Sequence, residues 1–145
     1  MEVCPNIRKG CSEDEDWLFQ LFRNTMQNYI DKVWGWDELL QREGFVTSLP
    51  ARNFAILELN GTSIGSYYLS DRANHYLLEM ILVAPDTQRK GYGSLMMKQI
   101  KHQSTDHNKP VWLSVLKTNP AIQFHLANGF RQVEEDEHSI RMMWP

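Results

Sequence analysis

The segment with the clearest chemical content spans residues 83–94 and reads VAPDTQRKGYGS. It predicts the end of a buried strand, a tight loop and the start of a helix. The amides in the first turn of a helix have no partner within the helix, so they bind anions. Gly91 and Gly93 leave room for a phosphate near the backbone. Arg89 and Lys90 add positive charge at the same end, either in contact with the phosphates or facing solvent. The segment therefore predicts a phosphate-binding loop, with an ordinary glycine-containing connection as the alternative.

Two well-known phosphate loops do not fit this segment. A dinucleotide-binding fingerprint needs a third glycine three residues after Gly93, where the chain has Met96. A P-loop needs a Gly-Lys pair followed by Ser or Thr, and the sequence contains no Gly-Lys pair.

A carboxylate that can move protons lies just before this loop. Glu79 is the single acidic residue of the apolar stretch 76–83, which we expect to be a strand buried on both faces. Burial would raise the pKa of Glu79 toward the range of a general base. The alternative is a carboxylate at a strand end, bonded to a backbone group or an arginine.

The elements that position these residues follow a regular order. Asn60-Gly61 is a strong hairpin signal, and Ser12 with Glu15 predicts a helix-capping box. We expect strands near residue 7 and at 54–59, 64–69, 76–83, 111–116, 130–133 and 140–144, and helices at 13–34, 36–43, 91–102 and 119–128. The order β-α-α-β-β-β-α-β-α-β-β predicts an α/β or mixed α+β layered fold.

Composition narrows the classes of protein. A chain of 145 residues with 42% hydrophobic and 23% charged residues is typical of one globular domain, which we expect to span residues 1–145. The net charge of −3 argues against a nucleic-acid binder. Cys4 and Cys11 have no partners at metal-ligand spacing, so we expect no metal site. No apolar segment has the length of a membrane span or a signal peptide, which predicts a cytoplasmic protein without a membrane partner.

The loop at 88–93 resembles the Q/R-x-x-G-x-G/A signature of the GNAT acetyltransferases, with Val-x-Pro before it. A second block of this family, N-x-A-x-x-F-Y-x-x-x-G-F, is matched downstream at Asn119, Ala121, Phe124, Gly129 and Phe130. The element order is also that of the family, so the resemblance covers essentially the whole chain. It implies a central twisted mixed sheet flanked by helices.

The resemblance implies acetyl-CoA as the donor substrate. The backbone of Leu82 and Val83 would pair with the pantetheine arm at a splay between two strands, and Phe124 would line its path. Asn119 would bond the pantetheine, with a plain helix cap as the alternative. The pyrophosphate would lie on the amides of the loop and first turn, at Arg89, Lys90, Gly91, Tyr92, Gly93 and Ser94.

Acetyl transfer to an amine needs the neutral amine. For a lysine-like amine with a pKa of about 10.4, removing the proton at pH 7 costs about 4.6 kcal/mol, so a general base should assist the reaction. By family resemblance, Glu79 would be this base, acting through water. The usual general acid of the family is a tyrosine where this chain has His125. We expect His125, about one-quarter charged at pH 7 in its ordinary state, either to protonate the departing thiolate or merely to pack beside Phe124.

The first two helices usually wall the acceptor groove in this family. Here they carry aromatic residues at Tyr29, Trp34 and Trp36, next to the acidic residues Asp31, Asp37 and Glu38. Aromatic faces and carboxylates suit a cationic amine. The alternative is that the tryptophans are core residues and the carboxylates are surface charge.

These residues together predict an N-acetyltransferase that moves an acetyl group from acetyl-CoA to an amine of a small molecule or peptide, as a monomer or homodimer. Direct attack in a ternary complex is expected, because neither cysteine lies near the donor segment. The missing tyrosine motivates a rival: a non-catalytic acyl-CoA-binding regulatory module.

Overall fold

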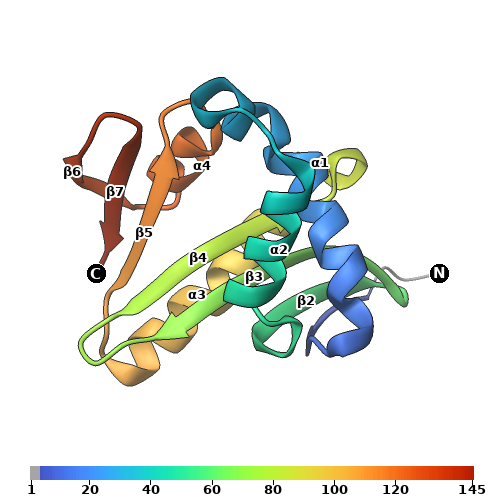
Figure 1. Ribbon diagram of the computed structural model, residues 1–145. Coiled ribbons are helices and arrows are strands. Elements are labelled where there is room, and N and C mark those ends of the chain that lie inside the picture. Colours follow the sequence, from blue (N-terminus) through green and yellow to red (C-terminus); the bar gives the residue numbers. More distant parts are fainter. Residues whose placement is uncertain (1–3) are drawn as a thin grey trace.

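The computed structural model describes residues 4–145, and within them seven strands form one sheet (Figure 1). The strand order is β1-β2-β3-β4-β5-β7-β6. Among the described strands, β4 and β5 are the one parallel pair, and the others pair antiparallel. The strands are β1 (Pro5–Lys9), β2 (Phe54–Leu59), β3 (Thr62–Asp71), β4 (Tyr76–Val83), β5 (Val111–Leu116), β6 (Arg131–Glu135) and β7 (Ser139–Trp144). The predicted mixed α/β fold and element order are confirmed.

Helices cover both faces of the sheet, with α1 and α2 in front of it and α3 behind it in Figure 1. Their bounds are α1 (Glu15–Trp34), α2 (Glu38–Ser48), α3 (Tyr92–His107) and α4 (Ala121–Ala127), with short 3-10 turns η1 (Ser12–Asp14), η2 (Ala51–Asn53) and η3 (Pro85–Thr87). No helix among residues 4–145 is both long enough and apolar enough to cross a bilayer.

Two apolar cores sandwich the sheet, because successive side chains of a strand point to opposite faces. Ile56 and Leu57 are both 0% exposed. Ile56 packs with α1 and α2, including Phe45, which stacks on Phe22 with ring centroids 4.8 Å apart. Leu57 packs with α3 in the second core, against Met96 and its neighbours. A strand of this kind reads as a continuous apolar run.

Local sequence signals explain most element ends. Asn60 and Gly61 take φ angles of 51° and 83°, as the predicted two-residue hairpin requires. The predicted capping box is displaced: Asp14, rather than Glu15, accepts a hydrogen bond from the amide of Cys11 at 2.9 Å. Two helices outrun their predicted ends. α2 continues past Gly44 because Phe45 is buried, and α3 continues to His107.

Candidate functional site

The central strands separate at one end of the sheet. β4 pairs with β5 only from Tyr76↔Val111 to Leu78↔Leu113, and beyond this point the ladder stops. A cavity of about 60 Å³ opens there between residues 78–82 of β4 and residues 113–115 of β5. The structure therefore contains a splay between neighbouring strands, and the backbone of β4 lacks a strand partner on that side.

The ladder between β3 and β4 determines which backbone groups face this splay. The amide of Ala84 donates to the carbonyl of Ile64 at 2.8 Å. Since the hydrogen-bonding side alternates along an antiparallel strand, Leu82 faces β3 and the groups of Ile81 and Val83 face the splay. The side chain of Gln88 accordingly reaches the carbonyl of Val83, donating at 3.0 Å. Ile81 is a residue that the sequence analysis missed.

The predicted phosphate-binding loop joins β4 to α3 through η3. Arg89 takes a left-handed φ of 64°, and Gly91 is the N-cap of α3 with a φ of 88°. The amides of Tyr92, Gly93 and Ser94 therefore lie in the first turn of α3, where no preceding helical carbonyl is available to them. These residues line a cleft of about 450 Å³ together with Leu82, Val83 and Phe124.

The two glycines of the loop serve different geometric needs. A Cβ at Gly93 would lie 3.2 Å from the ring of Phe124, so this glycine allows α3 to pack closely against α4. A Cβ at Gly91 would meet nothing within 4 Å, and its positive φ is what requires glycine there. Gly91 is also a lining residue of the cleft.

Asn119 lies at the rim of the same cleft. Its side-chain oxygen accepts from the amide of Ala121 at 2.9 Å, which caps the first turn of α4. Its amide nitrogen lies 3.7 Å from the sulfur of Met26 on α1. Asn119 thus makes a cap of the kind expected as the alternative, and it also faces the cleft.

Glu79 lies at a bulge of β4. Tyr68 pairs with Met80 and Leu69 with Leu78, so Glu79 has no partner across the ladder. The predicted burial of Glu79 is wrong: the bulge breaks the alternation of the strand and turns this residue toward solvent. Its Oε2 accepts from the hydroxyl of Ser70 at 2.7 Å and lies 3.4 Å from the guanidinium of Arg72.

His125 lies on the inner side of α4 and is only 4% exposed. It lines the cavity of the splay, as does Glu79, and its Nδ1 is buried without a hydrogen-bond partner among the described residues. Burial lowers the pKa of His125 to about 4. The expectation that His125 is partly charged at neutral pH is therefore wrong, because apolar neighbours such as Phe124 and Phe130 disfavour the imidazolium.

The predicted acceptor residues do not come together. Tyr29 lines the 450 Å³ cleft. Trp34 is 63% exposed, and its ring lies 5.5 Å from that of His138. Trp36 packs on Phe22, with ring centroids 5.8 Å apart, and donates its indole N–H to the carboxylate of Glu38. The two tryptophans thus belong to the connection between α1 and α2.

A larger polar groove of about 880 Å³ lies where β1 ends and β2 begins, and where β3 extends past both, paired only with β4. Arg52, Ser70, Arg72 and Glu79 are among its lining residues, and the first three were not anticipated from the sequence. Glu79 lines both this groove and the splay cavity. The splay cavity in turn shares Ile81 and Leu82 with the loop cleft. The three spaces therefore follow one another along β4.

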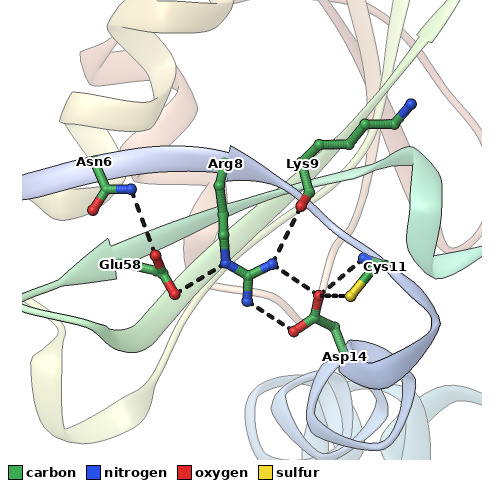
Figure 2. Close-up of polar contacts among 6 residues, drawn as sticks. All are labelled: Asn6, Arg8, Lys9, Cys11, Asp14 and Glu58. Atoms are coloured by element: carbon green, nitrogen blue, oxygen red, sulfur yellow. Dashed lines mark hydrogen bonds and ion pairs between the residues drawn. The ribbon is translucent and has the colours of Figure 1, made fainter.

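Arg8, which lines the groove from β1, is the centre of an ion-pair cluster (Figure 2). Arg8 donates to both carboxylate oxygens of Asp14, at 2.8 and 2.9 Å, and its Nε lies 3.0 Å from Glu58. The hydrogen bonds with Arg8 hold the pKa of Asp14 well below its usual range, and those with Asp14 and then Glu58 raise the pKa of Arg8.

Comparisons with known proteins agree with this fold. The profile of the acetyltransferase (GNAT) domain matches residues 50–132, more than half of the chain. The PaiA N-acetyltransferase from Thermoplasma acidophilum, solved in complex with coenzyme A, superposes with a TM-score of 0.80 at 18% identity, over 99% of this chain and 98% of that chain. The ribosomal-protein-S18-alanine N-acetyltransferase from Escherichia coli gives a TM-score of 0.75 at 19% identity, over 98% and 94%.

A third structure is longer than this chain. The N-acetylglutamate synthase from Neisseria gonorrhoeae, complexed with coenzyme A and L-arginine, gives a TM-score of 0.69 at 20% identity, over 98% of this chain and 33% of that chain. These likenesses show the fold. A sequence comparison with curated proteins gives no match.

Proposed function

The chain belongs to the GNAT acetyltransferase family, and from that premise we propose that it transfers an acetyl group from acetyl-CoA to an amine of a small molecule or peptide. The observation that carries the proposal is the continuous path along β4. The cleft at the first turn of α3 leads into the strand splay, and the splay leads to a solvent-facing carboxylate at Glu79. Acetyl-CoA supplies an activated thioester carbonyl, whose carbon an amine attacks.

The residues of the cleft fit a CoA-like donor. The first-turn amides of α3 would bind the pyrophosphate, and the open space at Gly91 leaves the backbone accessible to it. Arg89 and Lys90 are exposed and would add charge at that end. The outward backbone groups of Ile81 and Val83 would pair with the pantetheine arm in place of a strand. Leu82, Asn119 and Phe124 would line its path through side chains that face the cleft.

Glu79 is the proposed base. Ser70 and Arg72 both contact its Oε2, which fixes the carboxylate at the bulge. They leave Oε1 to accept a proton from the amine, directly or through a water molecule. Solvent exposure suits this role, since the proton must finally leave for bulk water.

The neutral state of His125 changes its proposed part. With a pKa of about 4, its imidazole is neutral at pH 7, so it can form hydrogen bonds but cannot act as an imidazolium acid. We therefore assign to it a hydrogen bond rather than a proton transfer: its unpaired Nδ1 lies at the splay, beside the path of the donor thioester. Direct attack needs no acyl carrier, and Cys4 and Cys11 are exposed residues outside these cavities.

Of the predicted acceptor residues, Tyr29 lines the cleft proposed for the donor, so its proposed contact is with acetyl-CoA next to the splay. Trp34 and Trp36 would act only indirectly, by shaping the connection between α1 and α2. The rival function is a non-catalytic acyl-CoA-binding module. The chain lacks the usual tyrosine acid, and the low pKa of His125 makes its replacement a poor proton donor, which supports this rival.

Two measurements test the proposal. Calorimetric titration with acetyl-CoA should give saturable binding, and no binding at millimolar ligand would refute both functions. A panel of amines scored for the release of free CoA then separates them. Release that depends on the amine supports the enzyme, whereas tight binding with no release for any amine supports the regulatory module.

A further inference from the structure

We propose that the acceptor carries an anionic group, a carboxylate or a phosphate, which Arg52 and Lys9 bind at one end of the 880 Å³ groove while the amine lies at Glu79. This inference rests on the proposed acetyl transfer and adds the chemical class of the acceptor. It makes the groove the acceptor site.

The position of the groove supports this assignment. The pairing of β2 with β3 ends at Phe54↔Tyr68, so the last residues of β3 form a free edge around which the groove runs. The groove meets the splay at Glu79, which lines both spaces. A molecule in the groove therefore reaches the proposed base from the side opposite the phosphate-binding loop.

The charge of the groove differs from that of the whole chain. Four cationic residues line it (Arg8, Lys9, Arg52 and Arg72) against two acidic ones (Asp71 and Glu79). When the ion-pair partners are included, Asp14 and Glu58 at Arg8 and Lys109 at Asp71, the local charge is +1. The whole chain has a net charge of −3. A cleft whose charge is opposite to that of the protein attracts an anion selectively.

Two of these cations are free to bind a ligand. Arg8 is occupied on both sides by Asp14 and Glu58, and Arg72 lies against Glu79. Lys9 follows Arg8 in the chain, but its side chain extends away from these carboxylates (Figure 2). Over residues 4–145, neither Lys9 nor Arg52 forms an ion pair.

The spacing of the strands limits the size of the acceptor. Lys9 pairs with Ala55, Ala55 with Tyr67, and Tyr67 with Ile81, so three strand spacings separate Lys9 from β4. At about 4.8 Å each, the backbones are roughly 14 Å apart. Lys9 and Glu79 both line the groove, so an acceptor that contacts both must be small, of about amino-acid size.

Amines of equal length and different charge test the inference. We would measure kcat/KM for acetylation of 4-aminobutyrate, butylamine and putrescine, with phosphoethanolamine and ethanolamine as the phosphate pair. The anionic member of each set should be preferred by about 10-fold or more, as expected for one charge-assisted contact of about 1.4 kcal/mol. The larger of the two preferences identifies carboxylate or phosphate as the natural group.

Variants then assign the preference to the groove. Arg52→Gln and Lys9→Gln should each reduce kcat/KM for 4-aminobutyrate by at least about 5-fold more than for butylamine, mainly through KM. Arg131→Gln is the matched control, because it removes an exposed cation of β6 that does not line the groove. The control should keep the wild-type preference.

The outcomes separate this inference from the proposed function. If butylamine or putrescine is acetylated as well as 4-aminobutyrate, the anionic acceptor is wrong and the acetyltransferase stands. If Arg52→Gln and Lys9→Gln keep the wild-type preference, the groove is not the site. If no amine releases CoA while acetyl-CoA still binds, the proposed function fails, and this inference fails with it.

Discussion

The ion-pair cluster around Arg8 and the splay between β4 and β5 differ in whether their polar groups have hydrogen-bond partners. In the cluster, three atoms of one guanidinium meet two carboxylates, and Asn6 and Cys11 add further donors (Figure 2). In the splay, the Nδ1 of His125 is buried without a partner among the described residues, and a strand edge is left unpaired.

This difference indicates that the cluster stabilises the fold, whereas the splay is available to bind a ligand. An unsatisfied buried polar group costs about 1–3 kcal/mol, so a sequence optimised for stability alone would not leave one beside an incomplete ladder. The Arg8 cluster joins β1, η1 and β2, and the guanidinium of Arg8 is already paired with Asp14 and Glu58. At the splay, β4 has no strand partner beyond Leu78, and the Nδ1 of His125 has no hydrogen bond among the described residues, which is what a site for a polar, extended donor needs.

The largest expected effect comes from removing the carboxylate next to the splay. Glu79→Gln should lower turnover by about 100-fold or more while acetyl-CoA affinity holds. The loss should shrink as pH rises, because free amine becomes abundant without a base. Steady-state kinetics from pH 6 to 9 and calorimetry measure the two quantities.

The same substitution in the cluster is the control. Glu58→Gln removes a carboxylate that pairs with Arg8 and lies outside the splay, so it should affect stability and leave the pH dependence of turnover unchanged. A loss for Glu79→Gln that is equal at every pH would contradict the base and indicate a structural role.

Next in size is the contribution of the cluster to stability. Asp14→Asn should lower the free energy of unfolding by about 1–2 kcal/mol at pH 7, because it replaces the carboxylate that holds Arg8. The pKa of Asp14 is depressed in the fold, so its contribution is complete above the unfolded pKa of about 3.9 and fades as pH falls below it.

Urea titrations at pH 7 and pH 3 measure this difference. The difference between wild type and Asp14→Asn should be full at pH 7 and only partly reduced at pH 3, because the folded carboxylate stays ionised there. Acetyl-CoA affinity at pH 7 should be the same for both. A variant that folds normally but binds acetyl-CoA weakly would show that the two regions are not independent.

The sequence predicted the fold well because its signals are local. The Asn60-Gly61 turn and the apolar runs of β2, β4 and β5 each depend on neighbours in the chain. The glycine loop was recognisable for the same reason, since its chemistry lies within residues 83–94.

The features that were missed depend on contacts between different elements of the fold. The exposure of Glu79 comes from a bulge against β3, and the sequence around it reads as an unbroken apolar strand. The partners of Arg8 lie 6 and 50 residues away, at Asp14 and Glu58. The low pKa of His125 follows from the packing of α4 on the sheet. Residue type alone could not reveal these three properties.

Two glycines with similar backbone conformations, Gly91 in the loop before α3 and Gly61 in the β2–β3 hairpin, provide a test of the phosphate assignment. Gly91 and Gly61 have φ angles of 88° and 83°, and a Cβ at either would meet nothing within 4 Å. Gly91→Val and Gly61→Val should therefore lose similar stability through backbone strain. Only Gly91→Val should weaken acetyl-CoA binding, by about 10-fold, because its side chain would enter the space proposed for the pyrophosphate. Equal affinities for both variants would disprove the phosphate assignment.

The smallest expected effect concerns the buried imidazole. The folded protein holds His125 neutral with a pKa of about 4, whereas the unfolded chain protonates it at about 6.5. The unfolded state therefore binds more protons between these values, and stability falls as pH falls through that window. From pH 7 to pH 5.5 the loss should be about 1 kcal/mol. His125→Phe should lack it, and His102→Gln, a change at an exposed residue of α3, should keep it.

The same imidazole distinguishes a hydrogen bond from proton transfer in catalysis. An imidazolium donor would give wild type a falling limb of turnover above its pKa, and His125→Phe would remove that limb. With a pKa of about 4 the residue does not titrate between pH 6 and 9, so the two proteins should share the shape of their profiles. His125→Phe should instead lower turnover by a constant factor of a few-fold, the cost of one lost hydrogen bond of about 1 kcal/mol. A profile whose shape changes in the variant would restore His125 as the acid.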